Sequence, residues 1–217
     1  IAHDLHPDYL GTQWARGCLG GSAAGRFADL PRFAVQHHHA HLASCLAEHG
    51  HEDAAIGIIL DGTGYGTDGT IWGGEFLVGN AAGLTRAGHF AHLPMPGGER
   101  AAREPWRMAF AAMHALHGAK ASDAFPAWTS RRSTQEIDAA LFSLETGENA
   151  PVTSSCGRLF DAVASLTGLY DVAHFEAQAA IALEFAAGDT SRPAYAYSIE
   201  KAAPIVLSFL PAFQEII

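Results

Sequence analysis

The sequence predicts an α/β fold in which a sheet-bearing part precedes a mainly helical part. Three stretches typical of strands occur before residue 98, whereas Ala-rich stretches with apolar residues at helical spacing follow it. Strands first and helices later differ from a regular βαβ alternation. The chain has 217 residues, of which 48% are hydrophobic, which is enough to bury a core. We therefore divide it into residues 1–98 and residues 99–217.

The sheet-bearing part begins with residues 1–36, which look loop-rich because HPDYLGT and GCLGGSAAG contain Pro and Gly breaks. Residues 37–49 predict a helix that ends at Gly50. The apolar run at residues 55–60 stops at Asp61-Gly62, which is typical of a buried strand. Two further strands are expected at Thr70–Val78 and Leu84–His92, joined near Gly79-Asn80.

The helical part follows the turn PMPGG. The segment Glu99–His117 favours a helix, and Pro105 suits the first turn of its stable portion. Ser133–Leu144 opens with S-T-Q-E, the pattern of a capping box. Gly157–Gly168 and His174–Ala187 predict two more helices.

Composition limits the possible environments and partners. The formal net charge of −10 disfavours a nucleic-acid surface. The three cysteines (Cys18, Cys45, Cys156) are odd in number and form no CxxC, which disfavours a disulfide scaffold and fits a reducing cytoplasm. We expect Cys45 and Cys156 to be structural. Neither a secretion signal nor an apolar stretch of membrane-spanning length is recognisable, so we expect no contact with a membrane. The chain begins with Ile, and we expect it to be a piece of a longer polypeptide.

A dense histidine cluster lies in VQHHHAHLASC, at His37, His38, His39 and His41. On a helix, His37 and His41 project from the same face, one turn apart, as two imidazoles that bind one cation do. The zinc-protease pattern H-E-x-x-H is excluded because position 38 is His instead of Glu. We expect His38 and His39 to lie off the metal-facing side, where they would contact substrate. Surface or core histidines without a metal remain the alternative.

Asp61 is the natural third ligand, because it ends a strand and opens the glycine-rich DGTGYGTDGT. Glycines let backbone N–H groups approach anionic oxygens, which suits phosphate binding as well. No Walker lysine follows, so the segment is not a P-loop. A site with two histidines and one carboxylate also occurs in iron oxygenases, but a glycine-rich phosphate loop argues against that class.

Several other charged side chains allow either a structural or a binding role. Arg100, Arg103 and Arg107 would bind an anion or form a solvated face. Asp161, in an otherwise apolar helix, would be capped, paired or in contact with ribose hydroxyls. Glu176 lies in FEAQAAIALE, where the packing of a helix of small residues explains most of the pattern.

Six segments together resemble the C-terminal Kae1-like domain of the HypF family, the carbamoyltransferases that mature [NiFe] hydrogenases. These segments are DLHPDYL, VQHHHAHLAS, DGTGYGTDGTIWGGEFL, LPMPGGERAAREPWRMA, TSSCGRLFDAVASLTGL and FEAQAAIALE. The resemblance covers most of the chain in order, and it implies an α/β fold of the actin/Hsp70-like ATPase class (ASKHA, Kae1-like). Only part of that domain is expected here, namely parts of its first sheet-bearing lobe and a helical segment.

The resemblance also implies site residues. His37, His41 and Asp61 would bind a divalent metal, Zn²⁺ or Fe²⁺, beside nucleotide phosphates. Gly62, Thr63 and Gly64 would form the phosphate loop, and Asp161 and Glu176 would contact the ribose. A fourth metal ligand, an aspartate, is expected outside this chain. The family's YEGQAA appears here as FEAQAA, which changes Tyr to Phe at position 175 and Gly to Ala at position 177.

The implied reaction converts carbamoyl phosphate and Mg·ATP into carbamoyl-adenylate and passes the carbamoyl group to the C-terminal cysteine of HypE. We expect the isolated piece to bind a metal weakly and to lack full activity. Alternatives are a related carbamoyltransferase that acts on a small-molecule hydroxyl, and a degenerate module that binds metal or nucleotide without catalysis. The tRNA threonylcarbamoyl transferases of the same superfamily are disfavoured by the motif QHHHAH and by the negative net charge of the chain.

Overall fold

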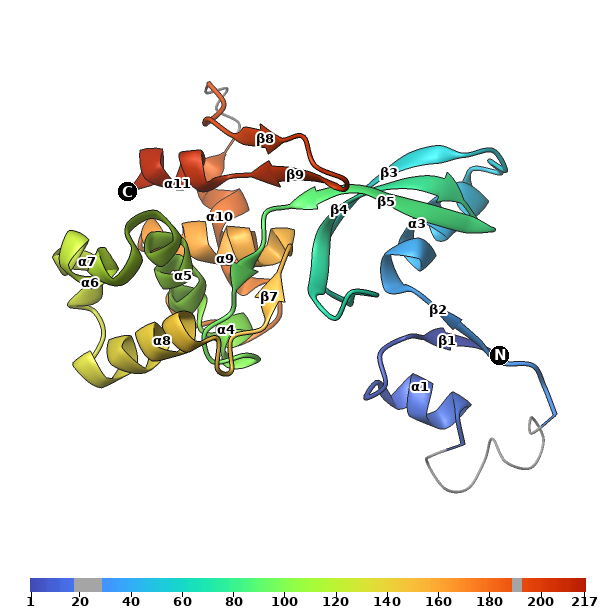
Figure 1. The fold of residues 1–217 in the computed structure, drawn as a ribbon, viewed down its shortest axis with the longest axis horizontal. Coiled ribbons are helices and arrows are strands. Elements are labelled where there is room, and N and C mark those ends of the chain that lie inside the picture. The colour runs from blue at the N-terminus through green and yellow to red at the C-terminus, as the bar shows by residue number, and fades with distance from the viewer. Residues whose placement is uncertain (18–28, 189–192) are drawn as a thin grey trace.

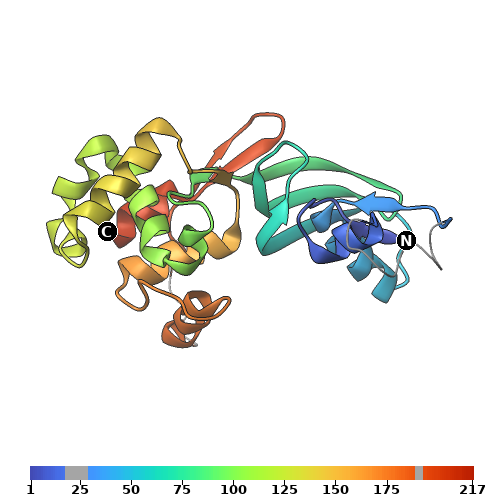
Figure 2. The same ribbon diagram turned by 90° about the horizontal axis from the view of Figure 1, so that it is seen from below.

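The computed structural model describes residues 1–17, 29–188 and 193–217. The molecule is elongated, with most of its helices at one end (Figures 1 and 2). At the other end lie three strands, β3 (Ala55–Tyr65), β4 (Ile71–Asn80) and β5 (Gly83–Phe90), with helix α3 (His37–Glu48). The N-terminal segment lies beside the end that carries α3 (Figure 1). Within the described residues, no helix combines the length and the apolar character needed to cross a membrane.

The N-terminal segment is more regular than the sequence predicted. Strand β1 (Ala2–Asp4) pairs in parallel with β2 (Phe33–Val35), and α1 (Leu10–Ala15) lies between them in the sequence. Strands of three residues are too short for an alternating pattern to be read, so only the Pro and Gly breaks were visible. Most of GCLGGSAAG, with Cys18, lies outside the described residues.

The predicted helix at residues 37–49 is confirmed as α3 (His37–Glu48). The side chain of Gln36 caps its first turn by accepting a hydrogen bond of 2.8 Å from the backbone N–H of His39. Gly50 follows the helix with a φ of +59°, a conformation that glycine adopts readily. Leu42 and Leu46 pack the apolar face of α3 onto the sheet.

The three predicted strands are also confirmed, as β3 (Ala55–Tyr65), β4 (Ile71–Asn80) and β5 (Gly83–Phe90), which pair antiparallel. The predicted end of the first strand is wrong, because β3 continues through Asp61-Gly62 as far as Tyr65. Its pairing with β4 shifts register between Leu60 and Gly64. The segment DGTG is therefore an irregular stretch of strand, and the chain reverses only after it.

Four short strands extend this sheet and were not predicted: β6 (Leu93–Pro94), β7 (Val152–Thr153), β8 (Ser198–Glu200) and β9 (Ile205–Ser208). They give the strand order β6-β7-β4-β5-β9-β8, with β3 also on β4. β9 runs parallel to β5, and β7 parallel to β4. Residues 99–217 thus complete the sheet as well as supplying helices.

The helices of the second part are α4 (Arg100–Arg103), α5 (Pro105–His117), the 3₁₀ helix η1 (Gly118–Lys120), α6 (Ala121–Ala124), α7 (Pro126–Thr129), α8 (Thr134–Thr146), α9 (Cys156–Leu166), α10 (Gln178–Ala187) and α11 (Leu210–Ile216). Pro105 opens α5, and Ser133 with Glu136 forms the capping box of α8, both as predicted. The start predicted for α10 is wrong: Glu176 precedes this helix, and Ala177 adopts a left-handed conformation.

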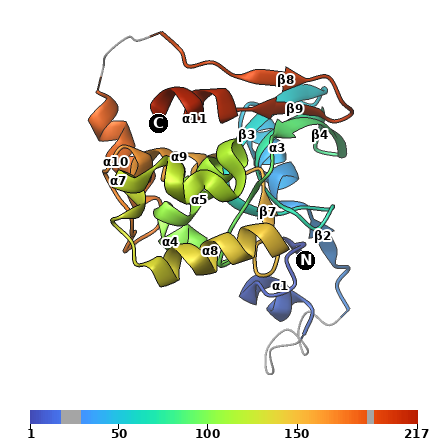
Figure 3. The ribbon, with the colours of Figure 1, turned by 60° about the vertical axis from the view of Figure 1, so that its left-hand side comes forward.

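Helix α5 lies at the centre of the second part and packs against α8, α9 and α11 (Figure 3). Residues on all its sides are buried, among them Trp106, Met108, Phe110 and Met113. A helix buried on all sides belongs in an interior, and α5 accordingly contributes to two of the three hydrophobic clusters among the described residues. The third cluster lies under α3, around Trp72 and Leu77.

Candidate metal centre and adjoining cavity

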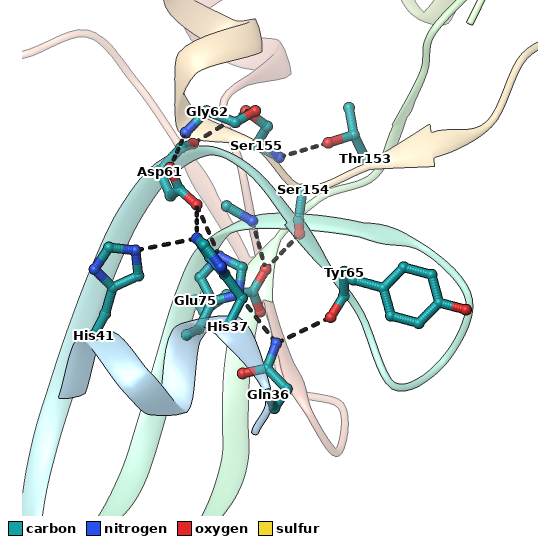
Figure 4. Close-up of polar contacts among 12 residues, drawn as sticks. Gln36, His37, His41, Asp61, Gly62, Tyr65, Glu75, Thr153, Ser154 and Ser155 are labelled. Carbon is teal, nitrogen blue, oxygen red and sulfur yellow. Dashed lines mark hydrogen bonds and ion pairs between the residues drawn. The ribbon is translucent and has the colours of Figure 1, made fainter. Parts of the chain in front are cut away.

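The structure brings His37, His41 and Asp61 together, so that one ligand atom from each lies within 4.8 Å of the others. The Nε2 atoms of the two histidines are 3.3 Å apart, and His37 Nε2 lies 3.3 Å from Asp61 Oδ2 (Figure 4). The helical spacing of His37 and His41 and the strand position of Asp61 account for this convergence. Ligation of a cation by the three residues stays a prediction.

Asp61 owes its position to close contact between β3 and the start of α9. Its Oδ1 accepts a hydrogen bond of 2.6 Å from the backbone N–H of Gly62. The hydroxyl of Ser155, which caps α9, lies 3.1 Å and 2.8 Å from the carbonyl oxygens of Asp61 and Gly62. A Cβ on Gly73 would stand 2.5 Å from the Asp61 carbonyl oxygen, and one on Gly157 would stand 2.9 Å from Gly62 Cα. Glycine is therefore required on both sides of this segment.

Asp4, for which no role was predicted, supports His37 from the opposite side. Its Oδ2 lies 2.8 Å from Nδ1 of His37, and its Oδ1 accepts a hydrogen bond from the backbone N–H of His6. A carboxylate beside Nδ1 favours the tautomer with the proton on that nitrogen, which leaves the lone pair of Nε2 directed toward His41 and Asp61. Metal-binding histidines commonly have such a carboxylate partner, so the donor set fits a divalent cation.

His38 is completely buried, between Gln36 and Asp61. Its Nδ1 lies 3.2 Å from Gln36 Nε2, and its Nε2 lies 3.6 Å from Asp61 Oδ2. Burial lowers the pKa of His38 to about 4, against the opposing effect of Glu75 and Asp61. The expected substrate contact of His38 is therefore wrong, because no part of this neutral ring reaches the surface. His39 points elsewhere, with Nε2 2.8 Å from the carbonyl oxygen of Asn80.

A buried ion pair supports the strands behind His38. Glu75 is fully buried and accepts hydrogen bonds from Arg86 Nε at 2.6 Å, from the hydroxyl of Ser154 and from the backbone N–H of Gly73. Arg86 also pairs with Asp68 at 2.8 Å and lies over the ring of Trp72. No periodic pattern in the sequence predicts this network, because its members lie on separate strands and turns.

A cavity of about 620 Å³ adjoins the cluster. Two residues of the predicted phosphate loop, Gly62 and Thr63, line it, as does Glu176. Gly64 faces the other way: a Cβ at this position would stand only 2.3 Å from Cε1 of His38. In this structure, Gly64 therefore makes room for the buried imidazole of His38. Of the three residues predicted to form the phosphate loop, Gly62 and Thr63 line the cavity and Gly64 does not.

The two predicted ribose contacts lie in different environments. Glu176 is exposed in the loop before α10. Asp161 is 3% exposed and does not line the cavity; its Oδ2 lies 2.9 Å from Nη1 of Arg158. Burial raises the pKa of Asp161 to about 6, although Arg158 acts in the opposite direction. Asp161 thus pairs with Arg158, a residue that lines the cavity.

The three arginines after the PMPGG turn lie in different environments. Arg100 is exposed and pairs with Glu104, which fits a solvated face. Arg107 is buried and pairs with the same carboxylate, whereas Arg103 lines the cavity. Cys156 is buried, and burial raises the pKa of its thiol to about 11. This agrees with the structural role expected for Cys156.

Two family models match the chain. The model described as "Carbamoyltransferase, Kae1-like Domain, second subdomain" matches residues 57–217, and the "HypF Kae1-like domain" matches residues 1–48. Among curated relatives, carbamoyltransferase HypF2 of Cupriavidus necator is 46% identical over 185 residues, which are 85% of this chain and 21% of that protein. Carbamoyltransferase HypF of Rhodobacter capsulatus is 42% identical over 197 residues, 88% of this chain and 25% of the relative.

Solved structures agree with this relationship. The crystal structure of full-length HypF in the phosphate- and nucleotide-bound form matches with a TM-score of 0.86 at 38% identity, over 100% of this chain and 26% of that one. HypF of T. kodakarensis matches with a TM-score of 0.83 at 31% identity, over 99% of this chain and 28% of that one. These likenesses confirm the Kae1-like α/β fold. The chain belongs to the HypF carbamoyltransferase family and corresponds to part of the Kae1-like domain of its members.

Proposed function

We propose that this chain is the part of a HypF-type carbamoyltransferase where a carbamoyl group passes from carbamoyl-adenylate to the C-terminal cysteine of HypE. Carbamoyl phosphate and Mg·ATP would supply the carbamoyl-adenylate, and the thiocarboxamide formed on HypE would lead to the cyanide ligands of [NiFe] hydrogenase. The observation that carries the proposal is that the cluster of His37, His41 and Asp61 adjoins a cavity lined by Gly62 and Thr63. The names of the relatives support the same reaction class.

The cluster offers two imidazole nitrogens and one carboxylate oxygen, a set that suits Zn²⁺ or Fe²⁺. A divalent cation bound there would offset negative charge on a phosphate group in the neighbouring cavity. Asp4 supports the proposal because it holds the Nδ1 side of His37 and leaves Nε2 for the cation.

The cavity also presents charges that suit a nucleotide. Arg103 and Arg158 line it and would attract phosphate oxygens. The carboxylate of Glu176 would accept hydrogen bonds from ribose hydroxyls, and Thr63 adds a hydroxyl beside Gly62. A related full-length HypF was crystallised in a phosphate- and nucleotide-bound form, which supports a nucleotide as the occupant.

The proposed step needs little proton transfer from this chain. The thiolate of HypE would attack the carbamoyl carbon, a C–S bond would form, and the bond from that carbon to the phosphate oxygen would break. AMP would leave as an anion, a good leaving group whose negative charge the cavity arginines stabilise. The task of these residues is to bind and orient the adenylate.

The test is a chimera, because the chain spans 21% of HypF2 of Cupriavidus necator. This chain replaces the equivalent segment of HypF2, and the chimera is mixed with HypE, carbamoyl phosphate and Mg·ATP. Mass spectrometry should then find one carbamoyl group on the C-terminal cysteine of HypE. His37→Ala and His41→Ala should abolish the transfer, and His49→Ala, an exposed change at the other end of α3, should leave it intact.

Failure of the folded chimera to modify HypE, or transfer that is unaffected by the two alanine variants, would refute the proposal. Modification of a small-molecule hydroxyl in place of the cysteine would identify the chain as part of an O-carbamoyltransferase.

A further inference from the structure

We propose that His38 is a positioning residue that holds the carboxylate of Asp61 in the orientation from which it ligates a divalent cation with His37 and His41. The inference rests on the metal site of the proposed function and adds a residue that is outside its ligand set. It starts from the burial of His38 beside Asp61, where its Nε2 lies 3.6 Å from Asp61 Oδ2.

Gln36 determines which nitrogen of His38 carries the proton. The side-chain oxygen of Gln36 accepts a hydrogen bond from the backbone N–H of His39, so its amide nitrogen must point the other way. This nitrogen donates to the carbonyl oxygen of Tyr65 at 3.2 Å and lies 3.2 Å from Nδ1 of His38 (Figure 4 shows Gln36 and Tyr65). An amide N–H requires an acceptor, so Nδ1 of His38 carries no proton and Nε2 does.

The protonated Nε2 of His38 faces Asp61 Oδ2, an acceptor that lacks a hydrogen-bond partner among the described residues. Neither His38 Nε2 nor Asp61 Oδ2 has a hydrogen-bond partner among the residues described, and both atoms are buried. A buried donor and a buried acceptor left unpaired are costly, so their mutual approach is favoured. At 3.6 Å they are not yet hydrogen-bonded, and a small rotation of the Asp61 side chain would close the distance.

The chemistry of a carboxylate permits both contacts at once. Each carboxylate oxygen offers two lone pairs, so Oδ2 of Asp61 can accept from His38 Nε2 and face a cation as well. Its other oxygen, Oδ1, is already held by the backbone N–H of Gly62 at 2.6 Å. Hydrogen bonds to both oxygens would fix the plane of the carboxylate, and such outer contacts raise metal affinity.

The fold holds the imidazole in place for this role. Gly64 on β3 passes so close to His38 that a Cβ there would stand 2.3 Å from its Cε1 and 2.9 Å from its Nδ1. On another side, the ring of His38 lies 5.8 Å from that of Trp72, between ring centroids. The ring is thus packed between Gly64 of β3 and Trp72 of β4, which restricts its rotation away from Asp61.

The first experiment titrates the full chain with Zn²⁺ alone by calorimetry. His38→Leu removes the donor, whereas His38→Gln keeps an N–H near the position of Nε2. His39→Gln is the matched control, because His39 faces Asn80. We expect His38→Leu to weaken Zn²⁺ binding by about 10- to 100-fold, as loss of an outer-shell contact does, and we expect His38→Gln to restore most of the affinity. Circular dichroism verifies that each variant is folded.

The outcomes separate this inference from the proposed metal site. If the wild type and a folded His38→Leu bind Zn²⁺ equally, His38 has no positioning role, although the metal site stands. If His38→Gln is as weak as His38→Leu, the ring is needed for another reason, such as direct ligation, and the inference fails. If the wild-type chain does not bind Zn²⁺, the metal site and the inference fall together.

A second measurement decides the matter if His38→Leu does not fold. Nitrogen-15 NMR of histidine-labelled wild-type chain at one fixed pH reports the tautomer of each ring. The spectrum should show His38, assigned by its loss in His38→Gln, with the proton on Nε2. A proton on Nδ1 would overturn the inference, because the ring would then present a lone pair to Asp61.

Discussion

Oδ2 of Asp4 lies 2.8 Å from Nδ1 of His37, although the two residues are 33 positions apart in the chain. The contact links the end of β1 to the first turn of α3 and directs Nε2 of His37 toward His41 and Asp61. The cluster itself comes from α3 and the irregular stretch of β3. Asp4 at the end of β1 supports His37, and Gln36 before α3 lies against His38.

Replacing Asp4 tests this link. Asp4→Asn keeps the shape of the side chain and removes its charge, so His37 becomes a weaker donor to a cation. We expect Zn²⁺ affinity, measured by calorimetry, to fall on the order of tenfold. Asp8→Asn, an exposed change in the same segment, is the control. Equal losses in the two variants would point to a general charge effect instead of a specific contact.

Gly64 is predicted to be intolerant of any side chain. In Gly64→Ala the new Cβ would stand 2.3 Å from Cε1 of His38 and 3.0 Å from Cδ2 of His37. Relief of such overlap requires the buried imidazole of His38 or the backbone to shift, and we expect the free energy of unfolding in urea to fall by about 1–3 kcal/mol. Gly83→Ala, where a Cβ meets nothing within 4 Å, should change it far less. A Gly64→Ala variant as stable as Gly83→Ala would show that the close packing around His38 is wrong.

Ala177 is predicted to be strained. It adopts φ +60° and ψ 11°, in the left-handed region, which costs alanine about 1–2 kcal/mol and is readily adopted by glycine. Ala177→Gly should therefore raise the free energy of unfolding by about 1 kcal/mol. Ala180→Gly, the same change within α10, should lower it by a similar amount, about 1 kcal/mol. Destabilisation by both changes would contradict the left-handed conformation at Ala177.

The buried carboxyl of Asp161 predicts a pH dependence of stability. Its pKa is about 6 in the folded chain, against about 3.9 for an unfolded aspartate. The folded state therefore binds more protons between these values, and the contribution of Asp161 to stability is lost as the pH rises from about 4 to about 6. Urea unfolding of the wild type minus that of Asp161→Asn, measured from about pH 4 to about pH 7, isolates this slope. A flat or rising difference would indicate an ordinary or lowered pKa.

The part of the site that could be predicted from the sequence is the part that local spacing encodes. His37 and His41 are four positions apart on a helix whose C-terminal glycine was visible, so their common face followed directly. Asp61 was visible as the acid after an apolar run. The glycine-rich segment was recognised as unusual, but only the structure separates Gly64, which faces His38, from Gly62 and Thr63, which face the cavity.

The remainder depends on contacts between distant segments. Asp4 meets His37 only because two three-residue strands pair, and neither strand is long enough to show a pattern. Strand β9 joins β5 from more than a hundred residues away, so strands within the mainly helical part were missed. The start of α10 was misplaced because Ala177 interrupts a stretch whose composition favours a helix.

The most direct test of the central claim, that His37, His41 and Asp61 hold one cation beside the cavity, is calorimetric titration of the chain with Zn²⁺. The account predicts one bound Zn²⁺ per chain. Each of His37→Ala, His41→Ala and Asp61→Asn should lower its affinity by about tenfold or more, since each removes a ligand. His49→Ala, at the far end of α3, should bind as the wild type does. Unchanged Zn²⁺ affinity in folded His37→Ala and His41→Ala would contradict the claim.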